Sequence, residues 1–290
     1  MFSELLQHSE VNDLISLALR EDEVNSDITT EICTAKQRKN VRATIVAKQK
    51  TIACGASLVD QILTLSNSAG LRLSKLAPEG AKLENKTPWL ILEGSAADLL
   101  RLERTILNFL IRMCGIAFTT RSIVEKISHT QCKLLHTRKT APGLRRIDVY
   151  SCLVGGAHAH RRSLGHYVLV KENHINAVGS FQDLIDGIQK YRKEKNDPNA
   201  FVEIEVRDFT ELKYALMAKP NRIMLDNFKV ADIKKAVDLF GGSVELEASG
   251  GITADNAVQY AETGVDYISL GAITHSAPAA DLSMLFDYSV

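Results

Sequence analysis

The second half of the chain alternates short apolar segments with amphipathic ones, and this alternation limits the possible folds more than any other feature of the sequence. Helical patterns separate most of six apolar segments of strand length. These segments centre on Leu134, Leu169, Ile204, Met224, Leu246 and Ile268. Because the connection between parallel strands is long enough to hold a helix, the alternation predicts βα units around a parallel sheet.

Each of the six segments ends in groups that can bind or react. These groups are His136, Thr137, Arg138 and Lys139, then Lys171, Glu205, Asp226, the turn formed by Ser249, Gly250 and Gly251, and Gly271. In an α/β barrel the carboxyl ends of the strands and the loops after them build one site. The pattern therefore favours an α/β barrel of the TIM-barrel type, which we expect to be incomplete.

The first part of the chain has the pattern of an α+β domain. A helical pattern covers Glu4 to Arg20, and a new helix cap is expected at Ser26 or Asp27. Short apolar or alternating segments follow from Val41 onward, separated by glycine and proline turns. They predict antiparallel strands with one helix near residues 58–65.

A long helical pattern from Ala96 to Lys126, interrupted around Gly115, connects the two parts of the chain. We therefore predict an α+β domain over residues 1–114 and an α/β-barrel domain over residues 115–274. The last residues, 275–290, have the composition of a strand that returns to the first domain.

Composition limits the ligand and the location. The 290 residues include 35 basic and 35 acidic side chains, so a small anion recognised locally is expected and nucleic acid is not. The five cysteines form no CxxC motif, which argues against disulfides and structural zinc and predicts a cytoplasmic location. We see no signal-peptide pattern and no apolar run of about 18 residues, so no membrane span is expected.

The stretch from Lys133 to His174 gathers cations within this neutral chain. Basic residues follow both of its apolar segments, and two glycines break the chain just before His160, Arg161 and Arg162. Glycine turns allow the backbone to approach a ligand closely. The stretch predicts a pocket for a small anion, and a solvated basic surface is the alternative.

Two carboxylates are candidates for binding a cation or a ribose. In the segment FVEIEV the side chains alternate, so that Glu203 and Glu205 face the interior of the predicted barrel. A buried Glu205 needs a partner such as Lys139, Lys171 or a divalent ion, unless the strand is a solvated edge strand. Asp226 follows another apolar strand and is placed to bind Mg²⁺ or ribose, or to cap the next helix.

A glycine turn is the candidate phosphate site. Ser249, Gly250 and Gly251 lie between an apolar strand and a helical pattern, and Gly271 repeats the arrangement one unit later. Phosphate sites in α/β barrels commonly use the last two βα loops. Either glycine motif alone is also typical of an ordinary turn.

His158 and His160, separated by one residue, raise a zinc site as a further alternative. The pair follows a glycine turn, however, and it adjoins Arg161 and Arg162, whose charges would repel a dication. An anion pocket therefore remains the preferred interpretation of this stretch.

Nearly the whole chain resembles the quinolinate phosphoribosyltransferase family, the carboxylating nicotinate-nucleotide pyrophosphorylases. The matching segments are ALREDEVNSDITT, ERTILNFL, TRKTAPGLR, GGAHAHR, LVKENHI, VEIEV, MLDNF, EASGGIT and GVDYISLGAITHSAPAADLSM. The resemblance implies an α/β-sandwich N-terminal domain, an α/β-barrel C-terminal domain and a homodimer in which each N-terminal domain covers the partner's barrel. It also implies a reaction of quinolinate with phosphoribosyl pyrophosphate, which gives nicotinate mononucleotide, pyrophosphate and CO₂ in de novo NAD synthesis.

The resemblance further implies roles for individual residues. Quinolinate would be bound by Arg138, His160, Arg161 and Lys171, with Arg104 acting in trans from the neighbouring subunit. Ribose and Mg²⁺–pyrophosphate would be held by Lys139, Glu205 and Asp226, of which Glu205 and Asp226 are the implied Mg²⁺ ligands. The 5′-phosphate would lie against Ser249, Gly250, Gly251 and Gly271. The implied catalytic residues are Lys139, Lys171, Glu205 and Asp226.

The chain departs from the family pattern at four positions. Ser26 replaces a glycine, His136 an aspartate, Val149 a lysine and Ala159 an asparagine. None of these positions has an implied direct role. The alternatives left open are a phosphoribosyltransferase for a related ring acid such as nicotinate, a zinc-dependent barrel hydrolase, and an anion-binding protein without catalytic activity.

Overall fold

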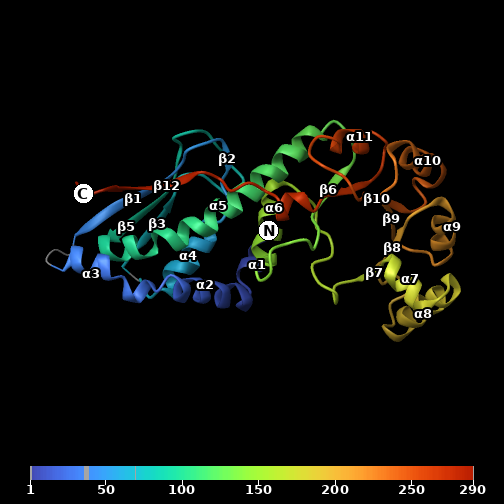
Figure 1. Ribbon diagram of the computed structural model, residues 1–290, viewed down its shortest axis with the longest axis horizontal. Helices are drawn as coiled ribbons and strands as arrows, with labels where there is room; N and C mark the ends of the chain where they lie inside the picture. The colour runs from blue at the N-terminus through green and yellow to red at the C-terminus, as the bar shows by residue number, and fades with distance from the viewer. Residues whose placement is uncertain (1, 36–38, 69, 290) are drawn as a thin grey trace. The chain divides into compact units, whose positions relative to one another are not determined.

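The computed structural model describes residues 2–35, 39–68 and 70–289, which form two compact units (Figure 1). The first, here called the sandwich unit, consists of Met1–Ser122, Thr140–Gly156 and Ile273–Val290. The second, the parallel-sheet unit, consists of Ile123–Lys139 and Ala157–Ala272. The division differs from the predicted ranges 1–114 and 115–274, because side chains from residues 147–153 pack into the hydrophobic core of the sandwich unit.

The sandwich unit contains an antiparallel sheet in the order β12-β1-β5-β3. Its strands are β1 (Asn40–Ala47), β3 (Arg72–Lys75), β5 (Pro88–Ser95) and β12 (Leu282–Asp287), and β2 (Thr51–Ile52) pairs separately with β4 (Lys82–Leu83). Side chains of β1 alternate between buried and more exposed positions, as expected for a sheet with one covered face. In the register, Ile45 lies between Leu90 and Met284, so the C-terminal segment completes this sheet.

The remaining elements that lie wholly or mostly in this unit are helical. They are α1 (Ser3–Leu6), α2 (Ser9–Glu21), the 3₁₀ helix η1 (Val24–Ser26), α3 (Ile28–Thr34), α4 (Ala56–Leu65), α5 (Ala96–Lys126), α6 (Arg145–Gly155) and α12 (Ala272–His275). The predicted first helix is divided into α1 and α2, because the His8 side chain accepts a hydrogen bond from the Glu10 N–H and caps α2. The predicted cap at Asp27 is confirmed, since its carboxylate accepts a hydrogen bond of 2.9 Å from the Thr30 N–H.

Helix α5 differs from its sequence pattern in two respects. It is continuous through Gly115, and among the described residues it is the one helix long and apolar enough to cross a membrane. Most of its apolar stretch is buried by the rest of the chain, as is typical of a core helix. The sequence pattern hid this stretch because two partly buried arginines interrupt the apolar run: Arg112, which pairs with Asp148, and Arg121, which donates to the carbonyl of Gly155.

The parallel-sheet unit contains six parallel strands in the order β6-β11-β10-β9-β8-β7. The strands are β6 (Lys133–Leu135), β7 (Val168–Val170), β8 (Val202–Val206), β9 (Arg222–Asp226), β10 (Glu245–Ser249) and β11 (Tyr267–Ser269). Helices α7 (Glu172–Val178), α8 (Phe181–Glu194), α9 (Phe209–Met217), α10 (Val230–Phe240) and α11 (Ala257–Ala261) alternate with them. The predicted parallel α/β fold is confirmed, and the barrel is open, because the edge strands β6 and β7 do not pair with each other within the described residues.

Gly115 allows a close backbone contact within the sandwich unit. A Cβ atom at this position would lie 2.1 Å from the carbonyl oxygen of Pro278. A backbone atom cannot turn away as a flexible side chain can, so any larger residue would push the C-terminal segment away from α5.

We predict that Gly115→Ala lowers the free energy of unfolding by about 1–3 kcal/mol, because the added methyl group overpacks this contact. Gly187→Ala is a matched control in another helix, since nothing lies within 4 Å of a Cβ atom there. The control is expected to raise the free energy of unfolding by about 0.5–1 kcal/mol. Urea denaturation of both variants measures the difference, and equal effects would contradict the packing argument.

Candidate active site

Parallel pairing brings the carboxyl ends of β8, β9 and β10 to one edge of the sheet. Val206 lies beside Leu225, and Asp226 lies beside Ser249. Glu205, one residue before the end of β8, therefore lies next to the strand that ends in Asp226, and the predicted phosphate turn begins at the end of β10. The structure thus brings three of the predicted groups together at the edge where an α/β protein binds its ligands.

The acidic part of this edge carries its own cation. The Nζ atom of Lys171, in the residue directly after β7, forms an ion pair with Oε2 of Glu205. Of the Glu205 side chain, 11% is exposed, so the expected need for a cationic partner is met by Lys171. Burial raises the pKa of Asp226, and the negative charge of Glu205 raises it further, against the opposing effects of Asn227, Lys171 and Lys139. The edge therefore holds two carboxylates close enough to repel each other.

These two carboxylates fit a hard divalent cation. Carboxylate oxygens are the protein ligands that Mg²⁺ prefers, and one or two of them usually suffice when a phosphate supplies the rest. A cation would relieve the repulsion that raises the pKa of Asp226. The alternative role of Asp226 as a cap of α10 is wrong, because Lys229 is the N-cap residue and the Asp226 carboxylate accepts a hydrogen bond from Asn227 Nδ2 at 2.8 Å.

The glycine turn after β10 has a backbone that requires glycine. Gly250 has φ of +85° and Gly251 has φ of +64°, both in the left-handed region. A Cβ atom on Gly250 would lie 2.4 Å from Oδ1 of Asn227, whose own N–H donates a hydrogen bond to the carbonyl of Ser249. Next to the turn, the hydroxyl of Ser269 donates to that of Ser249 at 3.0 Å. Gly271 follows β11, which is the neighbour of β10 in the sheet.

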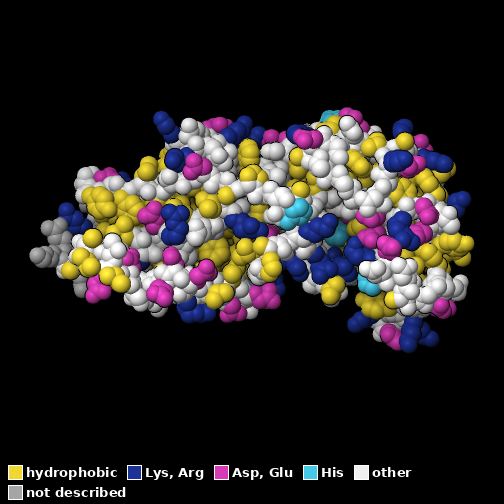
Figure 2. All heavy atoms as spheres, in the orientation of Figure 1, with side chains coloured by type: hydrophobic (Ala, Val, Ile, Leu, Met, Phe, Trp, Pro, Cys, Tyr) yellow, Lys and Arg dark blue, Asp and Glu magenta, His cyan; other side chains and the backbone are white. Residues whose placement is uncertain are grey.

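Two arginines supply positive charge that the described protein atoms do not neutralise fully. Burial lowers the pKa of Arg161, and repulsion by the nearby Arg138 lowers it further. The Nε atoms of both side chains are buried and have no hydrogen-bond partner in the part of the chain that the structure describes. In the space-filling view, Lys and Arg side chains gather over the loop between α6 and β7, and acidic side chains lie beside them over β8 and β9 (Figure 2). Buried guanidinium donors without partners indicate an anion site.

Beneath these arginines lies a buried ionic network. His160 Nε2 is 3.2 Å from Glu203 Oε2 and 3.4 Å from Glu247 Oε2, and both glutamates are fully buried. Arg222 Nη1 donates a hydrogen bond to the same oxygen of Glu247 at 3.3 Å. The hydroxyl of Tyr167 donates to Glu203 at 3.1 Å. Sequence reasoning placed Glu203 inside but assigned no role to Glu247, Arg222 or Tyr167.

The network gives its two histidines, His160 and His136, different charge states. Burial alone would lower the pKa of His160, but hydrogen bonds to Glu203 and Glu247 raise it to about 9. The pKa of His136 falls to about 4, first because it is buried and then because His160 is charged. His136 is thus neutral, and its Nε2 accepts a hydrogen bond of 3.1 Å from the His160 N–H. The pKa of Glu247 is lowered despite its burial, because His160 stabilises the carboxylate.

The structure does not support the zinc pair predicted as an alternative. His158 is exposed, and its backbone N–H donates a hydrogen bond to the carbonyl of Leu134 in β6. Within the described residues, the one group of metal-ligand type with close ligand atoms is His160, Glu203 and Glu247. Its Glu247 already binds the guanidinium of Arg222, and a protonated His160 cannot coordinate a metal. We therefore interpret the group as an ion network.

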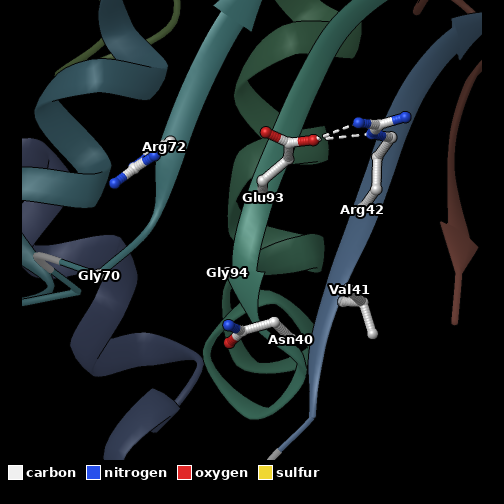
Figure 3. Close-up of a pocket in the computed structure, with 7 residues that line it drawn as sticks. All are labelled: Asn40, Val41, Arg42, Gly70, Arg72, Glu93 and Gly94. Carbon is white, nitrogen blue, oxygen red and sulfur yellow. Dashed lines mark hydrogen bonds and ion pairs between the residues drawn. The ribbon is translucent and has the colours of Figure 1, made fainter. Parts of the chain in front are cut away.

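Arg104 is the one predicted site residue in the sandwich unit. It lies at an exposed position of α5, whereas the other predicted site residues all belong to the parallel-sheet unit. The sandwich unit also has a cavity of about 360 Å³, shown in Figure 3. None of the predicted site residues lines it, and Arg42 there is already paired with Glu93 at 2.6 Å on a half-exposed surface. This cavity is not the candidate active site.

The open parallel sheet, with carboxylates, cations and a glycine turn at the carboxyl ends of its strands, defines an α/β enzyme that binds anionic substrates. Comparison with known proteins gives the family. Residues 27–114 match the model of the quinolinate phosphoribosyl transferase N-terminal domain, and residues 116–285 match that of its C-terminal domain. The chain belongs to the quinolinate phosphoribosyltransferase family.

Relatives cover nearly the full chain. The nicotinate-nucleotide pyrophosphorylase [carboxylating] of Mycobacterium leprae is 36% identical over 94% of this chain and 95% of its own length. Quinolinate phosphoribosyltransferase [decarboxylating] 1b of Nicotiana tabacum is 34% identical over 96% of this chain and 83% of its own length. The solved structure of the nicotinate-nucleotide pyrophosphorylase from Francisella tularensis is 35% identical, covers 96% of both chains and has a TM-score of 0.87.

The raised pKa of His160 predicts a pH-dependent stability. The native state binds the proton more tightly than the unfolded chain, whose histidine has the ordinary value of 6.5. The resulting stabilisation, about 3 kcal/mol, is complete below that value and is lost as the pH rises through about 9. Urea denaturation from pH 6 to 9.5 should therefore show a steeper loss of stability for the wild type than for His160→Gln.

His129→Gln is the control for this measurement. His129 is an exposed histidine that also contacts a carboxylate, Glu262, at 3.1 Å. Because exposed ion pairs contribute little, its variant should keep the pH dependence of the wild type. A His160→Gln variant with an unchanged pH dependence would show that the buried ring is not charged.

Proposed function

We propose that this protein transfers the phosphoribosyl group of phosphoribosyl pyrophosphate to quinolinate and removes one carboxylate of the product as CO₂. The products are nicotinate mononucleotide, pyrophosphate and CO₂, and the reaction belongs to de novo NAD synthesis. The observation that carries the proposal is the pair formed by the half-buried Arg138 and the buried Arg161, whose buried Nε donors have no hydrogen-bond partner among the described residues. Planar guanidinium groups match the two carboxylates of quinolinate, and family membership supports this substrate.

The quinolinate pocket would consist of cationic side chains from three segments of this unit, which follow β6, α6 and β7. We assign to it Arg138, His160, Arg161 and Lys171, with Arg104 of the partner subunit. In this arrangement the cations bind the dicarboxylate in a desolvated pocket and fix the plane of the ring. Lys171 also remains paired with Glu205, which links the quinolinate pocket to the edge that binds the second substrate.

Phosphoribosyl pyrophosphate occupies the edge formed by β8, β9 and β10. Glu205 and Asp226 would hold Mg²⁺ and the ribose hydroxyls, and Lys139 would contact the pyrophosphate. When bound, Mg²⁺ supplies positive charge that stabilises the departing pyrophosphate. The backbone around Ser249, Gly250, Gly251 and Gly271 would contact the 5′-phosphate, because glycine leaves room for oxygen atoms close to the chain.

Catalysis then depends on position and charge. The pocket cations orient quinolinate so that its ring nitrogen faces C1 of the ribose, and a C–N bond forms as the bond to pyrophosphate breaks. Lys139 stabilises the negative charge that develops on the leaving group. In the second step, on the bound nucleotide, the carboxylate next to the ring nitrogen leaves as CO₂ and a proton takes its place.

Product analysis with quinolinate, phosphoribosyl pyrophosphate and Mg²⁺ tests the proposal. Nicotinate mononucleotide and CO₂ in equal amounts are expected. Turnover of nicotinate alone would identify the enzyme as a phosphoribosyltransferase for a single ring carboxylate. Tight binding of quinolinate without turnover would instead identify an anion-binding protein, and activity that follows zinc content would identify a hydrolase.

Asp226→Asn tests the carboxylate edge. We predict an increase of about tenfold or more in the Mg²⁺ concentration for half-maximal rate, because one of two anionic ligands is lost, with little change in quinolinate affinity. A Mg²⁺ titration of the steady-state rate measures this value. Asp238→Asn, on the exposed side of α10, is the control and should behave as wild type. An unchanged Mg²⁺ dependence in Asp226→Asn would remove the residue from the metal site.

The role of Arg104 in trans predicts complementation between subunits. Arg104→Ala and Lys139→Ala homodimers should each be nearly inactive. After subunit exchange, random pairing makes half of the dimers mixed, and each mixed dimer has one intact site. About a quarter of the wild-type activity should therefore return if sites act independently. Demonstrated exchange without recovery would place Arg104 in its own subunit's site or outside it.

A cytoplasmic location stays a prediction.

A further inference from the structure

The two buried glutamates connect the proposed quinolinate pocket to the interior of the sheet. Glu203 and Glu247 stand on β8 and β10, on either side of β9, and both approach the ring of His160 from below the strand ends. Neither side chain has any solvent exposure. Carboxylates in such a place cost stability, and apolar residues of the same size would fill the space without this cost.

A second set of contacts fixes the glutamates themselves. Arg222, on β9 between them, contacts Glu247 at 3.3 Å and Glu245 at 3.0 Å. Its guanidinium lies 3.9 Å from the centre of the Tyr267 ring and 5.5 Å from that of Phe201. A planar cation held by two carboxylates and two aromatic rings has little freedom to rotate. Glu247 is therefore held between Arg222 and His160.

Tyr167 extends the same network to the next pocket residue. Its hydroxyl donates to Glu203 Oε2 at 3.1 Å and accepts a hydrogen bond of 3.1 Å from the Arg161 N–H. The ring of His160 and the backbone of Arg161 are thus both tied to Glu203. Two adjacent members of the proposed pocket receive their positions from one buried carboxylate.

We propose that Glu203, Glu247, Arg222 and Tyr167 are positioning residues, which hold His160 as an oriented cation and Arg161 in place for the quinolinate carboxylates. The inference rests on the proposed function and deepens it, because it explains how an exposed loop after α6 presents a fixed pair of cations. On this proposal the buried charges are retained because they position the binding cations, although apolar residues would fill the same space at a lower cost. None of these four residues touches the substrate in this scheme.

The groups that face His160 agree with a positive charge on its ring. They are Glu203 on β8, Glu247 on β10, the neutral His136 after β6, the Tyr167 hydroxyl, and more distant Arg222. Against burial, the two carboxylates raise the pKa of His160 to about 9. The ring therefore remains cationic at neutral pH, where the carboxylates of a ring acid are ionised.

Glu247→Gln is the main test, because it removes the charge and keeps the size of the side chain. The dissociation constant for quinolinate should increase about tenfold or more, while that for phosphoribosyl pyrophosphate changes less than twofold. The ¹⁵N chemical shifts of His160 should show a cationic ring at pH 8 in wild type and a neutral ring in the variant. Calorimetry and NMR on the full-length protein provide the two readouts.

Glu245→Gln is the matched control. Glu245 stands two residues earlier on the same strand and binds the same arginine, but it is 43% exposed and has no contact with His160. Its variant should weaken quinolinate binding less than Glu247→Gln does, and it should keep the histidine shifts of the wild type, because both carboxylates beside His160 remain. If both glutamine variants weaken quinolinate equally, or if His160 of the wild type is neutral at pH 8, the inference is overturned.

Two further variants keep the test decisive. Tyr167→Phe removes one hydroxyl and should weaken quinolinate about threefold to tenfold, so it replaces Glu247→Gln if that variant does not fold. Arg161→Ala tests the pocket itself and should weaken quinolinate more than any other variant. If Arg161→Ala has no effect, the proposed function fails. If Arg161→Ala weakens binding but Glu247→Gln and Tyr167→Phe do not, only the positioning inference fails.

Discussion

Two buried carboxylates in the parallel-sheet unit require positively charged side chains around them. Glu203 and Glu247 lie inside the sheet, where an ionised group is tolerated only beside positive charge. His160 and Arg222 provide that charge at distances of 3.2–3.4 Å. Since His160 comes from a loop and Arg222 from a strand, charge compensation ties a loop at the site to the centre of the sheet. The position of the His160 ring thus follows from the need to compensate charge in the interior.

Part of this arrangement was predictable from the sequence. Alternation in FVEIEV placed Glu203 inside and demanded a cation for Glu205, and the ion pair with Lys171 provides it. The position of a polar group after each apolar segment predicted the edge where Glu205, Asp226 and the glycine turn meet, because parallel strands align their carboxyl ends. Both predictions rely on local periodicity and on one general property of parallel sheets, so they needed no knowledge of distant contacts.

The remainder depends on contacts between residues far apart in the chain. The segment VELEAS repeats the spacing of FVEIEV, which was a signal for a second buried carboxylate at Glu247, but no pattern says that Arg222 will lie between the two. Residues 140–156 follow a strand of one unit and pack into the other, because the apolar side of α6 fits the core of the sandwich unit. Sequence spacing also made Asp226 a candidate cap, and only the geometry of the turn excludes it.

The pairing of β12 with β1 has a consequence for synthesis of the protein on the ribosome. β1 begins at Asn40, but its neighbour β12 begins at Leu282, after the whole parallel-sheet unit. While the nascent chain grows, one edge of β1 has no partner and offers unpaired backbone groups to other strands. The parallel-sheet unit can complete its strands before β12 is synthesised, and the antiparallel sheet gains β12 only afterwards. Slow translation of the residues between β1 and β12 thus prolongs the interval in which this edge of β1 is open to other strands.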